Sequence, residues 1–279
     1  MRSLPMRLLG YAATSFTWVL VLAVTFPLLW MLGTAFKRPT ELFAKPPTFF
    51  PHAPTLQNFV DVLEQTKFTT YATNSLIVAT VTTLFVLVVA TLGAHAMVSF
   101  KLMGRHVVAR ALLLCYMLPT TAVLIPIYLM IAGLGLANSL SGLIVAYTSL
   151  TLPFALWLMR AFFAGIPPEI EAAALIDGAS RLRAFVDVVL PQALPGIVTT
   201  GVFSFLICWN EYLYSLVMIN DDRTRTLPTG IMGTLVNGYA IEWGMVMAAA
   251  TMMSVPLLLV FLFLQRYVVQ GFGAGAVKG

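Results

Sequence analysis

The chain has 279 residues, of which 59% are hydrophobic and only 10% are charged. An ordinary soluble domain has about 25% charged residues and about 45–50% apolar ones. A protein of this size cannot hide such an apolar excess in its core, so a soluble enzyme, a disordered chain and a disulfide scaffold are excluded. The formal net charge of +5 fits basic residues held on the cytoplasmic side of a membrane better than nucleic-acid binding. Composition therefore predicts an all-α membrane protein.

Charged residues divide the sequence into uncharged stretches, and a helix needs about 20 apolar residues to cross a bilayer. The stretch between Arg110 and Arg160 is too long for one span, and it breaks at the turn-rich segment 133–142. The first apolar run is too long for a cleaved signal peptide, so we interpret it as a retained span. Six spans are predicted, at residues 12–34, 72–99, 107–132, 140–163, 196–219 and 244–266.

The distribution of charge predicts the orientation of these spans. With six spans, both termini lie on one side, together with ten basic and four acidic residues, against six basic and six acidic residues on the other side. Basic residues in short loops favour the cytoplasm. We therefore expect a cytoplasmic N-terminus at 1–11, an extracytoplasmic loop at 35–71, a core at 72–266 and a cytoplasmic tail at 267–279.

The extracytoplasmic loop has two parts. Five prolines between residues 38 and 55 predict an extended segment without a helix. Apolar residues then recur at helical spacing from Leu56 to Leu63, which predicts a short amphipathic helix with Thr55 as a possible N-cap. This helix either lies on the membrane surface or packs beside the spans, and we favour packing.

The loop at residues 165–195, between the fourth and fifth spans, predicts two short helices with a tight corner. Pro168 suits the first position of a helix, and Gly178 suits the left-handed residue that ends it. Asp177 or Ser180 can cap a second helix, which Pro191 and Pro195 should close. From the residues alone, the loop either seats in a partner's groove or merely joins two spans.

The loop carries a specific spacing of residues. Glu171-Ala172-Ala173 is followed five residues later by Gly178, and then by Val188, Leu190 and Pro191. This pattern resembles the EAA loop of ABC importer permeases. Other features resemble the carbohydrate branch of these binding-protein-dependent permeases, in particular the second permease subunit of maltose-type importers: Asn58-Phe59, Asn74-Ser75, Trp209-Asn210-Glu211-Tyr212 and the tail from Gly271 to Gly279.

The resemblance implies a type I ABC importer permease fold with six transmembrane helices, in a bacterial or archaeal inner (plasma) membrane. It implies four partners besides membrane lipid: a second homologous permease chain, two ATPase subunits and an extracytoplasmic solute-binding protein. ATP and Mg²⁺ would be bound by the ATPase, and no cofactor or metal by this chain. The residues it implies for coupling to the ATPase are Glu171, Ala172, Ala173, Asp177, Gly178, Leu190 and Pro191, with Glu171 expected to meet a basic residue of the ATPase.

Two further sites are predicted from the residues. The glycines of the tail predict a flexible stretch whose Gly275 and Lys278 contact the ATPase pair; the alternative is a frayed terminus. In the fifth span, a carboxylate is costly facing lipid, so Glu211 is expected in the bundle interior or a water-filled cavity. With Asn210 and Tyr214 it forms a possible translocation path, while the alternative role of Glu211 is packing against a neighbouring span or the partner permease.

Three competing functions stay open at this stage. A membrane enzyme needs a nucleophile–base pair or a metal set, and neither His52, His95 and His106 nor the two cysteines, 93 residues apart, have such spacing. An ion-coupled secondary transporter would use intramembrane carboxylates. A polyamine or phosphonate ABC importer is the alternative substrate class. The chain has no phosphate-binding Gly-x-x-x-x-Gly-Lys-Ser/Thr loop of its own.

Overall fold

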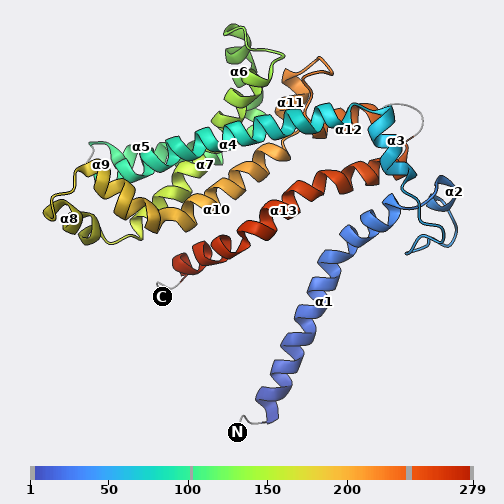
Figure 1. The fold of residues 1–279 in the computed structure, drawn as a ribbon, viewed down its shortest axis with the longest axis horizontal. Helices are drawn as coiled ribbons and strands as arrows, with labels where there is room; N and C mark the ends of the chain where they lie inside the picture. Colours follow the sequence, from blue (N-terminus) through green and yellow to red (C-terminus); the bar gives the residue numbers. More distant parts are fainter. Residues whose placement is uncertain (1–3, 101–102, 237–240, 277–279) are drawn as a thin grey trace. The chain divides into compact units, whose positions relative to one another are not determined.

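The computed structural model describes residues 4–100, 103–236 and 241–276, and all regular elements among them are helices (Figure 1). The chain divides into two compact units, one of residues 1–68 and 231–255 and the other of residues 69–230 and 256–279. The elements in chain order are α1 (Leu4–Ala35), α2 (Pro39–Leu42), α3 (Gln57–Gln65), α4 (Phe68–Ser99), α5 (Arg105–Met117), α6 (Thr120–Gly133), α7 (Leu140–Ala164), α8 (Pro168–Ile176), α9 (Arg181–Arg183), the π-helical segment η1 (Ala184–Val189), α10 (Leu190–Trp209), α11 (Leu213–Met218), α12 (Leu227–Leu235) and α13 (Trp243–Ala276).

Five helices among the described residues are long and apolar enough to cross a membrane, and the bent pair α5 and α6 makes a sixth candidate span. The predicted all-α membrane fold is confirmed, but the third span is not the single helix expected at 107–132. Its two halves meet at an angle of 103°. Pro119 causes the break, because it lacks an N–H and pushes Leu118 into an extended conformation (φ −65°, ψ 134°).

In the first unit, a buried amide joins α1 to α3. Asn58 Nδ2 donates to the backbone carbonyl oxygens of Ala35 and Lys37, each at 2.8 Å. The pair Asn58-Phe59, one of the features that resemble carbohydrate permeases, therefore has a structural role. The expectation of a loop without helix at 38–55 is wrong at one place. Pro39 opens the single turn α2, where its fixed φ suits the first position. Thr55 accepts the N–H of Gln57 at 3.1 Å, although the N-cap position itself is Leu56.

The core of the second unit lies among α4, α7, η1 and α10. It is built from small or apolar side chains: Val86, Ala90, Ala94, Ala155, Met159, Phe163, Phe185, Val189 and Ala193. Helices in a membrane associate through close packing of small residues. Gly93 shows this closeness, since a Cβ there would lie 2.9 Å from the Leu156 side chain. The small residues therefore bring α4 and α7 into direct contact.

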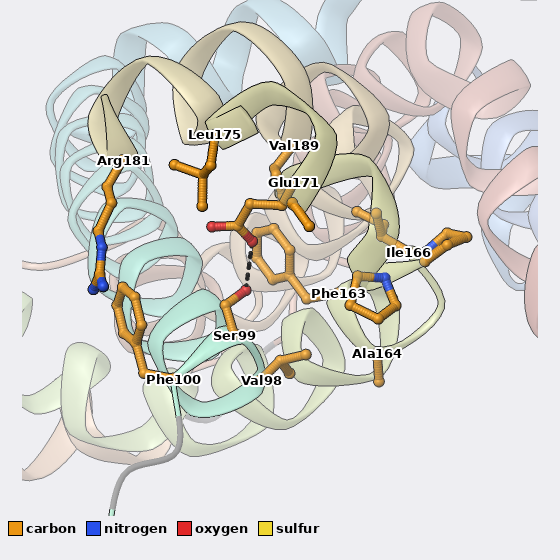
Figure 2. A pocket seen from close by; sticks show the side chains of 13 residues that line it. Val98, Ser99, Phe100, Phe163, Ala164, Ile166, Glu171, Leu175, Arg181 and Val189 are labelled. Atoms are coloured by element: carbon orange, nitrogen blue, oxygen red, sulfur yellow. Dashed lines mark hydrogen bonds between the residues drawn. The ribbon is translucent and has the colours of Figure 1, made fainter. Parts of the chain in front are cut away.

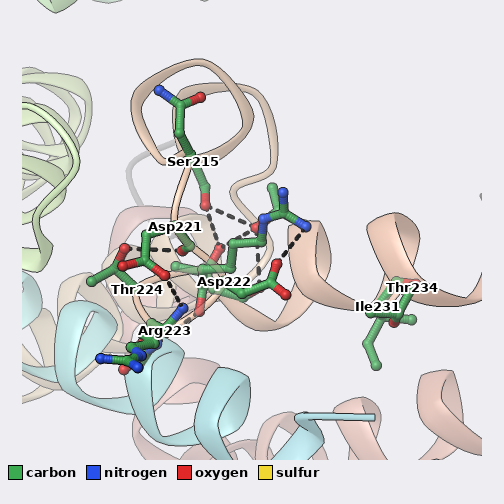
Figure 3. Close-up of polar contacts among 12 residues, drawn as sticks. Ser215, Asp221, Asp222, Arg223, Thr224, Ile231 and Thr234 are labelled. Atoms are coloured by element: carbon green, nitrogen blue, oxygen red, sulfur yellow. Dashed lines mark hydrogen bonds and ion pairs between the residues drawn. The ribbon is translucent and has the colours of Figure 1, made fainter. Parts of the chain in front are cut away.

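At one end of the second unit, the segment between α11 and α12 is held by polar contacts (Figure 3). Asn74 Nδ2 donates to the carbonyl oxygens of Arg223 and Arg225 at 2.8 and 2.9 Å. Asp221 Oδ1 accepts the N–H of Arg223, and Arg225 forms an ion pair of 2.9 Å with Asp222. Ser75 Oγ accepts the N–H of Leu227 at 2.7 Å. The pair Asn74-Ser75 thus fixes this segment onto α4.

Candidate coupling site

Helix α8 begins and ends as the sequence predicts. Pro168 occupies its first turn, and Gly178 lies just beyond its end with a φ of +88°. The N–H of Gly178 donates to Leu175 O, and that of Ala179 donates to Ala174 O, at 3.2 and 3.0 Å. This pair of bonds is the Schellman arrangement that closes many helices on a glycine.

After the corner, the chain departs from the prediction. Ser180, not Asp177, caps the next helix, accepting the N–H of Arg183 at 3.3 Å. Pro191 and Pro195 do not close this helix. It continues through η1 into α10 as far as Trp209, forming one apolar run from Arg181. Pro191 is tolerated because it lies in the first turn of α10, directly after the wider π-helical turn.

The carboxylate of Glu171 contacts residues of α4 in the same chain. Glu171 Oε2 accepts a hydrogen bond of 2.9 Å from Ser99 Oγ and lies 3.4 Å from His95 Nε2 (Figure 2). Both partners lie near the end of α4, and the Glu171 side chain is only 18% exposed. A contact between Glu171 and an ATPase stays a prediction, but this carboxylate already has two partners within the second unit.

A cleft of about 460 Å³ lies beside Glu171 (Figure 2). Its wall includes Ala172 and Leu175 of α8, the aromatic ring of Phe100 and the side chain of Arg181. The Arg181 guanidinium stands 5.6 Å from the centre of the Phe100 ring, a distance typical of a cation–π contact. The cleft therefore combines apolar walls with one acidic and one basic group.

The other residues predicted for coupling are mainly on the surface. Ala172, Ala173, Asp177 and Gly178 are exposed, as is Pro191, whereas Leu190 is half-buried. Two apolar side chains that the sequence did not single out are also exposed in this region, Ile176 at 86% and Leu182 at 71%. These two aliphatic groups stand on either side of the Gly178 corner.

The structure changes the interpretation of Glu211. Helix α10 ends at Trp209, so Glu211 lies between two helices and not within the single helix expected for the fifth span at 196–219. Instead, the two oxygens of Glu211 accept the N–H groups of Tyr214 and Ser215 at 2.9 and 3.2 Å. Glu211 therefore caps α11. Tyr214 is buried and Asn210 is exposed, and a role of the three in translocation stays a prediction.

The structure describes only part of the tail that is predicted to contact the ATPase. Helix α13 extends to Ala276, so the glycine-rich stretch that we expected to be flexible is helical up to that residue. Gly275 lies in this last turn. Lys278 lies outside the residues that the structure describes.

Residues 87–273 match the family described as binding-protein-dependent transport system inner membrane component. The chain belongs to this family and is a membrane permease of an ABC transport system. This assignment confirms the resemblance to ABC importer permeases and does not fit an ion-coupled secondary transporter.

Relatives and solved structures agree with this assignment. The chain is 36% identical to the diacetylchitobiose uptake system permease protein DasC of Streptomyces coelicolor, over 94% of both chains. It is 33% identical to the trehalose/maltose transport system permease protein MalG of Thermococcus litoralis, over 91% of both chains. Its fold matches a chain of a bacterial ABC transporter involved in the import of alginate, with a TM-score of 0.79 and 21% identity over 96% of this chain and 99% of the other.

Proposed function

We propose that this permease carries sugars or oligosaccharides inward across the membrane, powered by a partner ATPase. The observation that carries the proposal is the likeness over 94% of both chains to a diacetylchitobiose uptake permease. Permeases named for trehalose/maltose and for sulfoquinovosyl glycerol are also 33% and 34% identical. The solutes that these three permeases are named for are all glycosides, which favours a carbohydrate over a polyamine or a phosphonate.

The surface of the coupling region supports an ATPase partner. Ile176 and Leu182 present exposed aliphatic side chains on either side of the Gly178 corner, and the small Ala172 and Ala173 lie on the same exposed helix. A helix with such a surface can seat in a groove of another protein. ATP and Mg²⁺ would then be bound by the two ATPase subunits, and the movement of α8 would open and close the path through this chain.

The remaining partners follow from the kind of transport system. One related structure holds an alginate transporter in complex with a periplasmic protein bound to an alginate pentasaccharide. For this chain we propose a solute-binding protein on the outer side, a second permease chain beside it, and both termini in the cytoplasm. Selection of the sugar would then rest largely on the binding protein.

The test is ATP-driven uptake in liposomes that contain the permease together with its cognate second permease, ATPase and binding protein. We expect uptake of a labelled oligosaccharide that requires both ATP and the binding protein. Competition by putrescine or an alkylphosphonate, but not by oligosaccharides, would overturn the sugar assignment.

A second measurement tests whether the exposed side chains of Ile176 and Leu182 belong to the surface that contacts the ATPase. Ile176→Asp should reduce co-purification of the ATPase at least tenfold, because it places a charge in an apolar interface. The matched control is Met103→Asp, which makes the same kind of change at a fully exposed side chain of another turn on the same predicted side. Equal recovery of the ATPase with both variants would contradict this surface.

A further inference from the structure

Helix α8 has little burial to hold it in place. None of its nine residues is buried, although it packs against η1. Burial of apolar area is the main force that fixes a helix on a protein. The orientation of α8 must therefore depend strongly on the few specific bonds that it makes.

His95 lies where it can supply such a bond. The residue is buried, at 7% exposed, and its ring is surrounded by Phe185, Phe163 and Phe100, with ring centres 4.5, 5.5 and 5.8 Å away. These three rings come from η1, from α7 and from the residue that follows α4. The aromatic enclosure fixes the plane of the imidazole and leaves Nε2 directed at Glu171.

We propose that His95, together with Ser99, is a positioning residue that locks α8 onto the cytoplasmic end of α4 through Glu171. Its role in transport rests on the proposed function: α8 would then drive the spans by two routes, through η1 into α10 and through Glu171 into α4. Without His95, the second route would rest on Ser99 alone.

The lock is tested directly by amide hydrogen exchange of residues 168–176 in the purified chain in lipid nanodiscs. Loss of a hydrogen bond to the Glu171 carboxylate makes local opening of the helix easier, so His95→Leu should speed exchange of α8 by about tenfold or more. His95→Gln should restore most of the protection, because the glutamine amide can donate from nearly the place of Nε2. In a Glu171→Ala background, His95→Leu should have no further effect, since the partner is already gone.

The matched control is Val86→Ala, which removes buried volume from the same core and the same helix but leaves the Glu171 contacts in place. If Val86→Ala and His95→Leu speed exchange of α8 equally, or if His95→Gln gives no recovery, His95 is a packing residue and the proposal is overturned.

The assembled importer supplies the second readout. His95→Leu should raise the number of ATP molecules hydrolysed per sugar imported several-fold, while His95→Gln and Val86→Ala stay near the parent value. If exchange changes as expected but the ATP-to-sugar ratio does not, the lock exists and its role in coupling is wrong. Failure of the parent chain to import sugar would count against the proposed function and leave the exchange result standing.

Discussion

Glu41 ties the proline-rich loop of the first unit together. Its Oε1 accepts hydrogen bonds from Thr48 Oγ1 at 2.8 Å and from the N–H of His52 at 3.0 Å. The bond from Thr48, followed by that from His52, lowers the pKa of Glu41 below its ordinary value of 4.5. The carboxylate form is thus the form that the folded loop prefers.

A dependence on pH follows from this lowered pKa. The contribution of Glu41 to loop order should be fully present above pH 4.5 and should be lost as the pH falls through the lower pKa of the folded state. At neutral pH, the amides of residues 48–52 should exchange faster in Glu41→Gln than in the parent chain, and this difference should shrink in acid. Glu64→Gln, at an exposed residue of α3, serves as the control and should leave these amides unchanged at every pH.

Gly178 has a left-handed φ that ordinary side chains resist. A non-glycine residue in this conformation costs about 1–2 kcal/mol, more for a β-branched one. Gly178→Val should therefore shift the corner, displace α8 and lower ATP-driven uptake at least tenfold. Gly178→Asn should keep most of the uptake, because asparagine is among the few non-glycine residues that tolerate the left-handed region. Equal uptake by both variants would contradict a conformational role for Gly178.

At the level of elements, the sequence predicts where a helix begins and ends, but not which distant residues its side chains contact. The bounds of α8 follow from the backbone preferences of Pro168 and Gly178, so the sequence alone predicts them. The partners of Glu171 lie 72 and 76 residues away in the chain, and no spacing rule reaches that far. Pro191 misled the prediction, because a proline that ends a helix and one that follows a π-helical turn look alike in sequence.

The break between α10 and α11 is a second feature that only the structure reveals. Residues 196–219 are mainly apolar, with Glu211 their one charged residue, and periodicity alone gives no reason to divide them. The division depends on the side chain of Glu211, which satisfies two N–H groups of α11. A carboxylate in an apolar run is therefore a signal for a helix start as well as for a transport path.

The capping role gives a graded prediction. Glu211→Ala should lower the free energy of unfolding by about 0.5–2 kcal/mol, the usual cost of losing a capping side chain. Glu211→Gln should lose less, because its amide oxygen can still accept one of the two N–H groups. Thermal unfolding in detergent checks the order parent, Gln, Ala. A loss of uptake in Glu211→Gln at unchanged unfolding temperature would instead favour a place for Glu211 on the translocation path.

At the scale of the whole molecule, much of the apolar surface is uncovered within the chain. Side chains of α1 such as Phe16 and Leu22 are 67% and 63% exposed, and Phe263 of α13 is 74% exposed. Lipid tails and neighbouring membrane chains can cover such surfaces, whereas water cannot without a large cost in free energy. The permease therefore depends on the membrane for its stability.

The proposed orientation can be checked with single cysteines. In a background without the exposed Cys115, a cysteine at Met103, whose side chain is fully exposed, should react with a membrane-impermeant maleimide only from the cytoplasmic side. A cysteine at Phe50, which is 84% exposed, should react only from the outside. Right-side-out and inside-out vesicles separate the two cases, and reversed labelling would place the termini outside.

The π-helical segment η1 sets the direction in which α8 points. A π-helical turn holds one residue more than an α-helical turn, and each residue of an α-helix advances the rotation by about 100°. If the same residues wound instead as an ordinary α-helix from Arg181 to Trp209, no wider turn would absorb the extra residue. Everything before η1 would then swing by about 100° around the helix axis, carrying Glu171 away from Ser99 and His95. The wider turn of η1 thus keeps α8 in phase with the apolar helix α10 that follows it.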